Sequence, residues 1–343
     1  MATKKGSNSF LQKAKAAKKD EFYTQLSDIE KELKNYKAHL NGKVVLCNCD
    51  DPRVSNFFHY FSYNFEKLGL KKLITTCFKN LNADLFSQNE SEKAIYLEYD
   101  GDKNGNNIPD PEEIGIKHFK DDGDFRSAEC IELLKKSDIV VTNPPFSLFR
   151  EYVGQLVEHE KKFVIIGHQN AITYKEIFKL IKENKLWLGY GFNRNCAHFI
   201  NRHYVDYASD ADHREGMIRV SGVQWFTNID ITKRHEELIL FKKYHRKEYP
   251  KYDNYAAIEV SQTIDIPMDY AGVMGVPITF LNKYNPEQFE ILGSDFEVKD
   301  GLLPQLVNPK WNGKIDRGYV NGQRLYSRLL IRNIKPCKSR SKK

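Results

Sequence analysis

The chain has 343 residues, with 53 Lys and Arg against 46 Asp and Glu and a formal net charge of +7. That length allows one large domain or two smaller ones, each with a sizeable core. No apolar run is long enough to span a bilayer, which argues against an integral membrane protein. Six cysteines without paired CxxC spacing, and no hydrophobic leader, argue against a secreted disulfide scaffold and predict a cytoplasmic protein.

The positive charge is concentrated at the two ends of the sequence. Residues 1–43 carry 10 Lys and 5 acidic residues, residues 301–343 carry 11 Lys and Arg and 1 acidic residue, and the remainder has a net charge of −8. This distribution favours an enzyme core flanked by segments that face a polyanion such as nucleic acid. The alternative is a pair of solvated tails, above all for residues 338–343.

The first half of the chain predicts the start of an α/β sheet. Residues 1–40 form a basic segment that contains a helix, because apolar residues recur every three or four positions over 26–36. A strand over 43–49, a helix over 54–68 and a strand over 70–77 follow. This βαβ order predicts parallel strands joined by a right-handed crossover.

Residues 100–113 superficially resemble a calcium-binding loop. The spacing is wrong for calcium, because Ile108 and Glu112 each arrive one residue late. Asn-Gly turn chemistry between 95–99 and 114–119 predicts a hairpin instead, and we expect no metal requirement.

The alternation of strands and helices continues through the middle of the chain. We expect a helix over 128–136, a strand at 139–141, a helix with an apolar stripe, a strand over 163–167, a helix around 177–181, and last strands at 187–189 and 223–228. The stripe consists of Phe149, Tyr152, Val153, Leu156 and Val157. The pattern predicts an α/β fold with a doubly wound, mostly parallel sheet and a catalytic domain over 41–240.

Two stretches lie outside this alternation. Residues 190–222 are rich in Gly, Asn, Arg and His, and they form either a loop over an active site or a long surface excursion; the length favours a functional loop. Beyond residue 240 the pattern becomes irregular. We expect residues 241–343 to form a target-recognition or DNA-binding region.

The most informative stretch is the strand that ends in Asn143, Pro144, Pro145 and Phe146. A β-branched run fits a strand buried on both faces, and two prolines without backbone donors must end it in a rigid loop. Ligands bind at the carboxyl ends of such strands. Asn143 Oδ1 and the Pro144 carbonyl could accept hydrogen bonds from the two N–H groups of an exocyclic amine, while Phe146 stacks on the ring of the base that carries the amine. Taken alone, the four residues fit equally well a proline turn with Phe146 in the core.

Longer stretches give the chain a family resemblance. With Asp124-Phe125 one helix upstream of this loop, the chain resembles the EcoRI-type adenine-specific DNA methyltransferases, which depend on S-adenosylmethionine. The resemblance is carried by DEFYTQ (20–25), CNCDDPRVSNFF (47–58), GDFRS (123–127), KKSDIVVTNPPFSLFREY (135–152), ITYKEIF (172–178), GVMGVPITFL (272–281) and NPEQFE (285–290). It implies a class I methyltransferase fold with a Rossmann-like sheet.

The resemblance also implies roles for particular residues. Asn143, Pro144, Pro145 and Phe146 would hold a flipped-out adenine. The cofactor would lie against Phe22, Tyr23, Thr24, Asp50, Asp51, Asp124 and Phe125, with Asp124 accepting from its adenine amine. The residue that binds the ribose stays unassigned, because Thr75, Thr76 and Cys77 close the second strand where the family usually has an acidic residue.

The resemblance implies a monomeric enzyme that methylates adenine N6 in a short palindrome of double-stranded DNA, GAATTC being a candidate. A cognate restriction endonuclease would be a separate chain, and the enzyme would be of bacterial or phage type. Two rivals stay open: a methyltransferase acting on RNA or on protein glutamine, and a non-catalytic DNA-binding protein on the same scaffold.

Four arginines are the expected DNA contacts. Arg194 lies in the 190–222 stretch, and Arg324, Arg328 and Arg332 are spaced by four. That spacing puts the last three on one face of either a helix or a strand. The alternative is that neighbouring leucines anchor the segment to the core and leave the arginines solvated.

Overall fold

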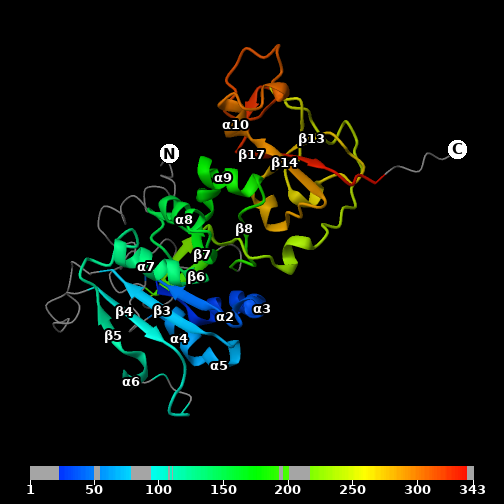
Figure 1. The fold of residues 1–343 in the computed structure, drawn as a ribbon. Coiled ribbons are helices and arrows are strands. Elements are labelled where there is room, and N and C mark those ends of the chain that lie inside the picture. The colour runs from blue at the N-terminus through cyan, green and yellow to red at the C-terminus, as the bar shows by residue number, and fades with distance from the viewer. Residues whose placement is uncertain are drawn as a thin grey trace. The chain divides into compact units, whose positions relative to one another are not determined.

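The structure is a computed structural model that describes residues 23–49, 55–78, 94–106, 109, 111–192, 196–200 and 217–337. They divide into two compact units (Figure 1). The first unit contains the chain up to Ile177 together with Leu188–Ile229, and the second contains Phe178–Trp187 and the chain from Asp230 onward.

The first unit is built on an eight-stranded mixed sheet in the order β5-β4-β3-β2-β6-β7-β11-β8. The strands are β2 (Val44–Cys47), β3 (Lys72–Cys77), β4 (Ile95–Tyr99), β5 (Ile116–His118), β6 (Ile139–Thr142), β7 (Lys162–His168), β8 (Trp187–Leu188) and β11 (Val223–Thr227). The run β3-β2-β6-β7 is parallel, as predicted. In contrast, β4, β5 and β11 pair antiparallel, so the sheet is mixed and not mostly parallel.

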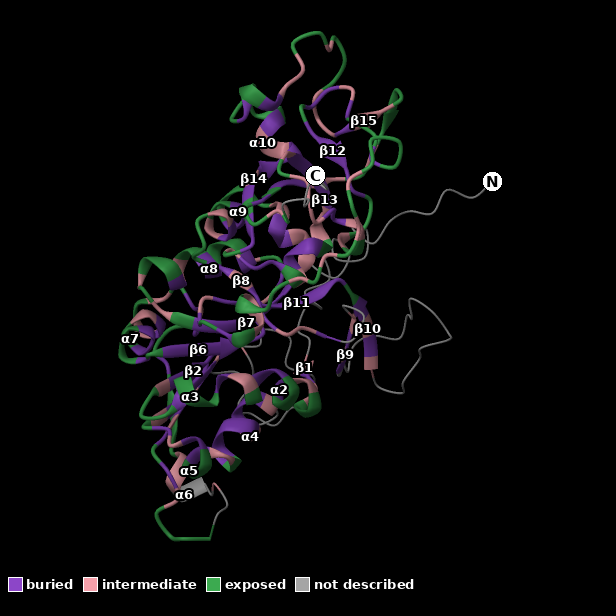
Figure 2. Cartoon of the chain, turned by 90° about the vertical axis from the view of Figure 1, so that its right-hand side faces the viewer, coloured by how far each residue is buried: buried purple, intermediate pink, exposed green. Residues whose placement is uncertain are grey.

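Burial explains why the central strands could be recognised. All four residues of β6 are buried, and only the first residue of β2 is not fully buried. Figure 2 shows β2, β6 and β7 in the colour of buried residues. Strands buried on both faces have continuous apolar runs, which is why the sequence shows no alternation there.

Helices follow the strands much as their apolar spacing predicts. They are α2 (Leu26–Leu33), α3 (Lys37–Leu40), α4 (Asn56–Tyr63), α5 (Phe65–Leu68), α6 (Pro111–Ile114), α7 (Ala128–Lys136), α8 (Phe149–Glu158) and α9 (Lys175–Lys182). Ser127 caps α7 by accepting a hydrogen bond from Cys130 N at 3.3 Å. Of the predicted α8 stripe, only Val157 is wrong: it is 37% exposed, while the other four residues are buried.

The stretch after residue 190 is partly regular. Strands β9 (Cys196–Ile200) and β10 (Met217–Ser221) pair antiparallel, and β1 (Tyr23–Thr24) pairs antiparallel with β9 on its other side. The stretch that was predicted to be a long loop therefore contains two strands, at residues 196–200 and 217–221.

The second unit contains a sheet that the sequence pattern did not reveal. Its order is β12 (Ile258–Glu259), β13 (Val273–Pro277), β17 (Arg328–Asn333) and β14 (Phe289–Ser294), accompanied by the hairpin β15 (Tyr319–Val320)–β16 (Gln323–Arg324) and helix α10 (Asp295–Lys299). Short 3-10 turns are η1 (Lys34–Tyr36), η2 (Gln169–Thr173), η5 (Thr232–His235), η6 (Thr263–Asp265), η7 (Ile278–Lys283) and η8 (Pro304–Leu306).

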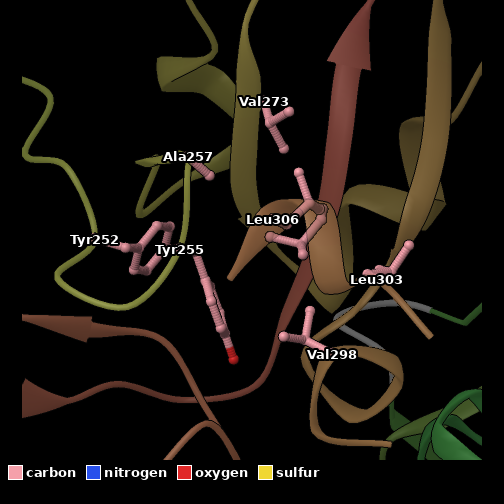
Figure 3. Close-up of a cluster of buried hydrophobic side chains, with 8 residues drawn as sticks. Tyr252, Tyr255, Ala257, Val273, Val298, Leu303 and Leu306 are labelled. Atoms are coloured by element: carbon pink, nitrogen blue, oxygen red, sulfur yellow. The ribbon is translucent and has the colours of Figure 1, made fainter. Parts of the chain in front are cut away.

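The second unit contains a cluster of buried hydrophobic side chains (Figure 3). Its members are Tyr252, Tyr255, Ala257, Val273, Val298, Leu303, Leu306 and Leu330. Val320 and Leu325 of the hairpin region pack against it. The cluster thus joins β13, β17, α10 and the hairpin into one body.

Polar contacts explain why 178–187 belongs to the second unit. The Arg234 guanidinium lies 3.9 Å from the centre of the Trp187 ring and donates to Asn184 Oδ1 at 3.0 Å. Lys182 pairs with Glu297 at 3.2 Å. None of the described helices is long and apolar enough to cross a membrane.

Candidate active site

The turn after β6 is held against the core of the first unit. The backbone N–H of Leu148 donates to Pro145 O at 2.9 Å, closing a tight turn that leads into α8. Asn143 is 7% exposed and Phe146 9% exposed, and the Oδ1 atom of Asn143 is itself buried. The strand, the prolines and the turn therefore fix where the Asn143 amide lies.

Hydrogen bonds tie this turn to the loop after the neighbouring strand β2. Thr142 Oγ1 donates to the backbone carbonyl of Asn48, and Tyr152 Oη on α8 donates to Asn48 Oδ1. Asn48, which directly follows β2, is buried. The ends of two parallel strands are thus fixed relative to each other, and this edge is where such sheets bind ligands.

The Phe146 ring packs near a histidine that sequence reasoning missed. His168 closes β7, and its ring centroid lies 6.4 Å from that of Phe146, with the planes at 58°. Its Nδ1 accepts from Asn170 N at 3.1 Å, which requires the proton of the neutral ring to be on Nε2. Burial lowers the pKa of His168, which favours that neutral form. The only signal was its place at the carboxyl end of a buried strand.

Asp124 and Phe125 lie on the approach to α7, and both contact Arg126. Arg126 donates to Asp124 Oδ1 through its backbone N and Nε, each at 2.8 Å, and to Oδ2 through Nη2 at 2.7 Å. Its guanidinium also lies 5.2 Å from the centre of the Phe125 ring and pairs with Glu151 at 3.1 Å. Arg126 lowers the pKa of Asp124, so this carboxylate is ionised at neutral pH. The Asp-Phe-Arg spacing was the available signal for this contact.

Gly123 lets the Asp124 loop approach the sheet closely. Its φ is +72°, and a Cβ there would lie 2.8 Å from both the Cys77 carbonyl oxygen and Ala94 Cβ. A side chain would push the loop away from the end of β3. Phe125, 8% exposed, meets the Tyr152 ring edge-on at 5.1 Å, so the loop also contacts α8.

Two of the residues predicted to lie against the cofactor, Tyr23 and Thr24, belong to a short strand. Tyr23 and Thr24 form β1, and the carbonyl of Thr24 accepts from Asn56 Nδ2 on α4 at 2.7 Å. Thr24 is 2% exposed, and its Oγ1 has no hydrogen-bond partner among the residues that the structure describes. A buried hydroxyl of this kind is suited to a polar ligand atom.

A buried carboxylate that the sequence gave no reason to notice fixes the start of the 190–222 stretch. Glu32 on α2 is 1% exposed and accepts from Tyr36 Oη at 2.9 Å, Tyr190 N at 2.8 Å and Gly191 N at 2.9 Å. Since three donors satisfy the charge, the interaction anchors the segment firmly.

The three C-terminal arginines do not form one group. Arg324 lies on β16, whereas Arg328 and Arg332 lie on β17 in another sheet, so the expected shared face for all three is wrong. Arg324 pairs with Asp316 at 2.7 Å and is 51% exposed, and Arg332 pairs with Glu290 at 3.2 Å and is 44% exposed.

Arg328 differs from the other two because little of its side chain is exposed. It is 11% exposed and donates to Glu259 through Nε at 3.1 Å and Nη2 at 2.7 Å. Leu329, Leu330 and Ile331 are buried and anchor the segment, as the alternative interpretation held, but Arg328 is paired with Glu259 and not solvated as that interpretation expected.

Four predicted site residues lie outside the described residues. They are Phe22, Asp50, Asp51 and Arg194. The structure brings the residues of the β6 turn and the loop that carries Asp124 to the same edge of the sheet, at the carboxyl ends of the parallel strands β6 and β3.

Comparison with known proteins identifies the relatives of the chain. Residues 10–334 match the family described as "Adenine-specific methyltransferase EcoRI". The chain is 50% identical over 333 residues to the Type II methyltransferase M.EcoRI of Escherichia coli, covering 95% of this chain and 97% of that protein. No solved structure matches the chain.

Two further relatives come from mycoplasmas. The Type II methyltransferase M.MgeORF184P of Mycoplasma genitalium is 39% identical over 333 residues, covering 93% of this chain and 97% of that protein. M.MpnI of Mycoplasma pneumoniae, also named a Type II methyltransferase, is 38% identical over 333 residues, covering 94% and 98%.

A mixed α/β sheet that places an Asn-Pro-Pro-Phe turn at the end of a central strand, together with these matches, defines an enzyme of the methyltransferase class. The chain belongs to the EcoRI-type adenine-specific methyltransferase family, and its activity is that of an adenine-specific DNA methyltransferase. RNA or glutamine methylation and a non-catalytic DNA-binding role are not favoured by relatives that are all named Type II methyltransferases.

Proposed function

We propose that the enzyme methylates the N6 amine of an adenine flipped out of duplex DNA, with Asn143 and Pro144 as the groups that hold the amine. The observation that carries this proposal is the buried Asn143 amide in a proline turn at the end of β6. Two carbonyl oxygens accepting from the two N–H bonds would draw the nitrogen lone pair out of the ring. Rigid acceptors need no reorganisation during the reaction, which is the basis of electrostatic preorganisation.

Stacking on Phe146 would orient the base. Flipping an adenine costs a few kcal/mol, and stacking on an aromatic ring returns about 1–3 kcal/mol. Packing near His168 supports this role because it limits how far the Phe146 ring can turn. Pro145 would stiffen the backbone between the amine-holding residues and the ring.

The cofactor implied by the family is S-adenosylmethionine, and the residues present fit it. Thr24 Oγ1, which is buried and has no hydrogen-bond partner in the described part of the chain, suits a polar ligand group, and the ionised Asp124 carboxylate suits the amine of an adenine ring. Each carboxylate oxygen has two acceptor sites, so Asp124 can bind that amine while it contacts Arg126. When bound, the cofactor supplies a methyl group on a sulfonium. Phe22, Tyr23, Asp50, Asp51 and Phe125 complete the proposed site, which uses no metal.

The finer features of fold and biology follow as proposals. Support for a doubly wound, Rossmann-like first unit comes from Figure 1, which draws α7 and α8 on one side of the central strands and α4 and α5 on the other. We infer a monomeric, cytoplasmic enzyme that acts on a palindrome, with GAATTC a candidate on the strength of the M.EcoRI relative. A cognate restriction endonuclease would be a separate chain, because the relatives are Type II methyltransferases.

DNA would be bound by the 190–222 stretch and the C-terminal region as the proposed target-recognition part. Arg194, Arg324 and Arg332 are the proposed contacts, and the basic excess of residues 301–343 supports them. Because Arg328 pairs with the buried carboxylate of Glu259, we assign it to stabilising the second unit instead.

The experiment that tests the function compares methylation in cells that express the wild type or Asn143→Ala. Sequencing that detects N6-methyladenine should find one methylated motif in the wild type and none in the variant. Methylated bases other than adenine, or equal methylation by the variant, would overturn the proposal. Equal protein levels and equal thermal melting of the two proteins are the control for folding.

A further inference from the structure

We propose that the β15–β16 hairpin is a groove-reading ribbon that selects part of the DNA target through Gln323 and Arg324. This inference rests on the proposed function and assigns the base-contacting residues that it leaves open. Two-stranded ribbons are narrow enough to enter the major groove of DNA.

The first argument is the geometry of the hairpin. Val320 pairs with Gln323, so the connection is the two-residue turn Asn321-Gly322. Both turn residues have positive φ, +51° and +75°, which gives the tight primed turn that matches strand twist. The hairpin is thus as slender as a two-stranded ribbon can be.

The second argument is that the base of the hairpin is held rigidly. Asn254, fully buried, donates to Arg317 O at 2.7 Å and accepts from Tyr319 N at 2.9 Å. Asp253 N donates to Tyr319 O at 2.8 Å, and Asp253 Oδ2 accepts from Gly322 N at 2.8 Å. A ribbon ordered before binding loses less entropy when it meets its partner.

Core contacts add to this rigidity. Val320 and Leu325 pack against the hydrophobic cluster of the second unit, whose Tyr252 and Tyr255 are drawn in Figure 3. The Tyr255 hydroxyl donates to Ile315 O at 3.1 Å, which holds the chain leading into the hairpin. The hairpin is therefore anchored by its apolar side chains and leaves its polar ones outside.

The third argument is the chemistry of the exposed side chains. Gln323, Arg324 and Tyr326 are exposed, Tyr326 at 87%. Glutamine can bond the edge of adenine in two places, and arginine can do the same with guanine. Arg324 donates to Asp316 Oδ2 through Nη2. Because a guanidinium has five N–H donors, Arg324 can also bind a base edge while Asp316 orients it.

The charge around the ribbon suits duplex DNA as the partner. Lys310 and Lys314 are exposed beside the hairpin, and the Trp311 indole donates to Lys314 O at 2.9 Å while its ring lies 5.2 Å from Tyr319. The lysines would contact phosphates on either side of the groove and fix the register of the ribbon.

The test measures methylation of a set of duplexes that carry every single-base change in the preferred site. Arg324→Ala and Gln323→Ala should each reduce the preference for one particular base pair by about 5- to 150-fold. The dissociation constant for S-adenosylmethionine and the thermal midpoint should stay unchanged, since both side chains are exposed. Lys299→Ala, an exposed lysine at the end of α10, is the matched control and should leave site preference unchanged.

Two outcomes would overturn the inference. An equal loss on every duplex would reduce the hairpin to a phosphate contact, and unchanged preference in both variants would remove it from the DNA interface. If the wild type methylates no adenine in any duplex, the proposed function fails. If the wild type methylates one site selectively and both hairpin variants show the same site preference as the wild type, only the hairpin assignment fails.

Discussion

The end of β6 in the first unit and strand β17 in the second unit use polar residues in opposite ways. Every residue of β6 is buried and Asn143 follows that strand in a turn, whereas Arg328 is the first residue of β17 and pairs with Glu259. A polar group just beyond a strand can meet a ligand. A charged group that is little exposed and packs against a buried carboxylate must be neutralised by the protein itself. The position of a residue relative to the strand end therefore decides whether its chemistry is available.

The largest effect that tests this comparison is expected at Asn143. Asn143→Ala should reduce methyl transfer by about 100- to 1,000-fold, because one of two acceptors for the reacting amine is lost. Binding of cofactor and of duplex should change only a few-fold, since the amide acts chiefly on the amine in the transition state. Single-turnover kinetics and equilibrium binding on the same preparation measure both. Loss of folding would instead make Asn143 a structural turn residue.

The opposite behaviour is expected at Arg328. Arg328→Ala should lower the free energy of unfolding by about 3–5 kcal/mol, because it leaves the Glu259 carboxylate buried without its partner. Urea denaturation measures this loss, and turnover per folded molecule should stay near that of the wild type. The double variant Arg328→Met with Glu259→Leu should recover most of the stability. A stable Arg328→Ala protein with weak DNA binding would place the arginine at the DNA interface after all.

These two residues also show what could be predicted from sequence. The strand before Asn143 was recognisable because a β-branched run is cut off by two prolines, and α7 has the bounds that its apolar spacing predicts. The partner of Arg328 was not recognisable, because Glu259 lies 69 residues away in the chain. Pairing between distant short strands leaves no local periodicity, and Gly275 and Pro277 within β13 are residues that are uncommon in strands.

The candidate site shows the same division between local and distant information. The Asp124–Arg126 contact spans two residues and follows from the sequence Asp-Phe-Arg. The contacts of Asn48 with Thr142 and Tyr152 bridge 94 and 104 residues, and they exist only because β2 and β6 are neighbours in the sheet. The end of the strand before Asn143 could therefore be predicted from sequence, but the hydrogen bonds that hold it could not.

A smaller effect is expected at Phe146, where the comparison can be sharpened. Phe146→Ala should weaken the flipped state by about 1–3 kcal/mol, the value of one base–aromatic stack. A fluorescent adenine analogue at the target position reports flipping directly. Phe146→Tyr keeps a stacking ring and is the matched control. If the analogue responds equally in the alanine variant and the wild type, Phe146 serves the core and not the substrate.

The smallest expected effect concerns Arg332, the exposed arginine of β17. Its pair with Glu290 lies at the surface, where such a contact contributes little stability, so the guanidinium can exchange Glu290 for a phosphate at small cost. One lost phosphate contact should reduce the slope of log affinity against log salt by about 0.9, equally for all sequences. Fluorescence anisotropy between about 50 and 200 mM salt measures the slope. Arg332→Ala should lower it, and Arg332→Lys, which keeps the charge, should preserve most of it. An unchanged slope in Arg332→Ala would mean that both arginines of β17 serve carboxylates of the second unit, and DNA contact by this region would then fall to the hairpin and its lysines.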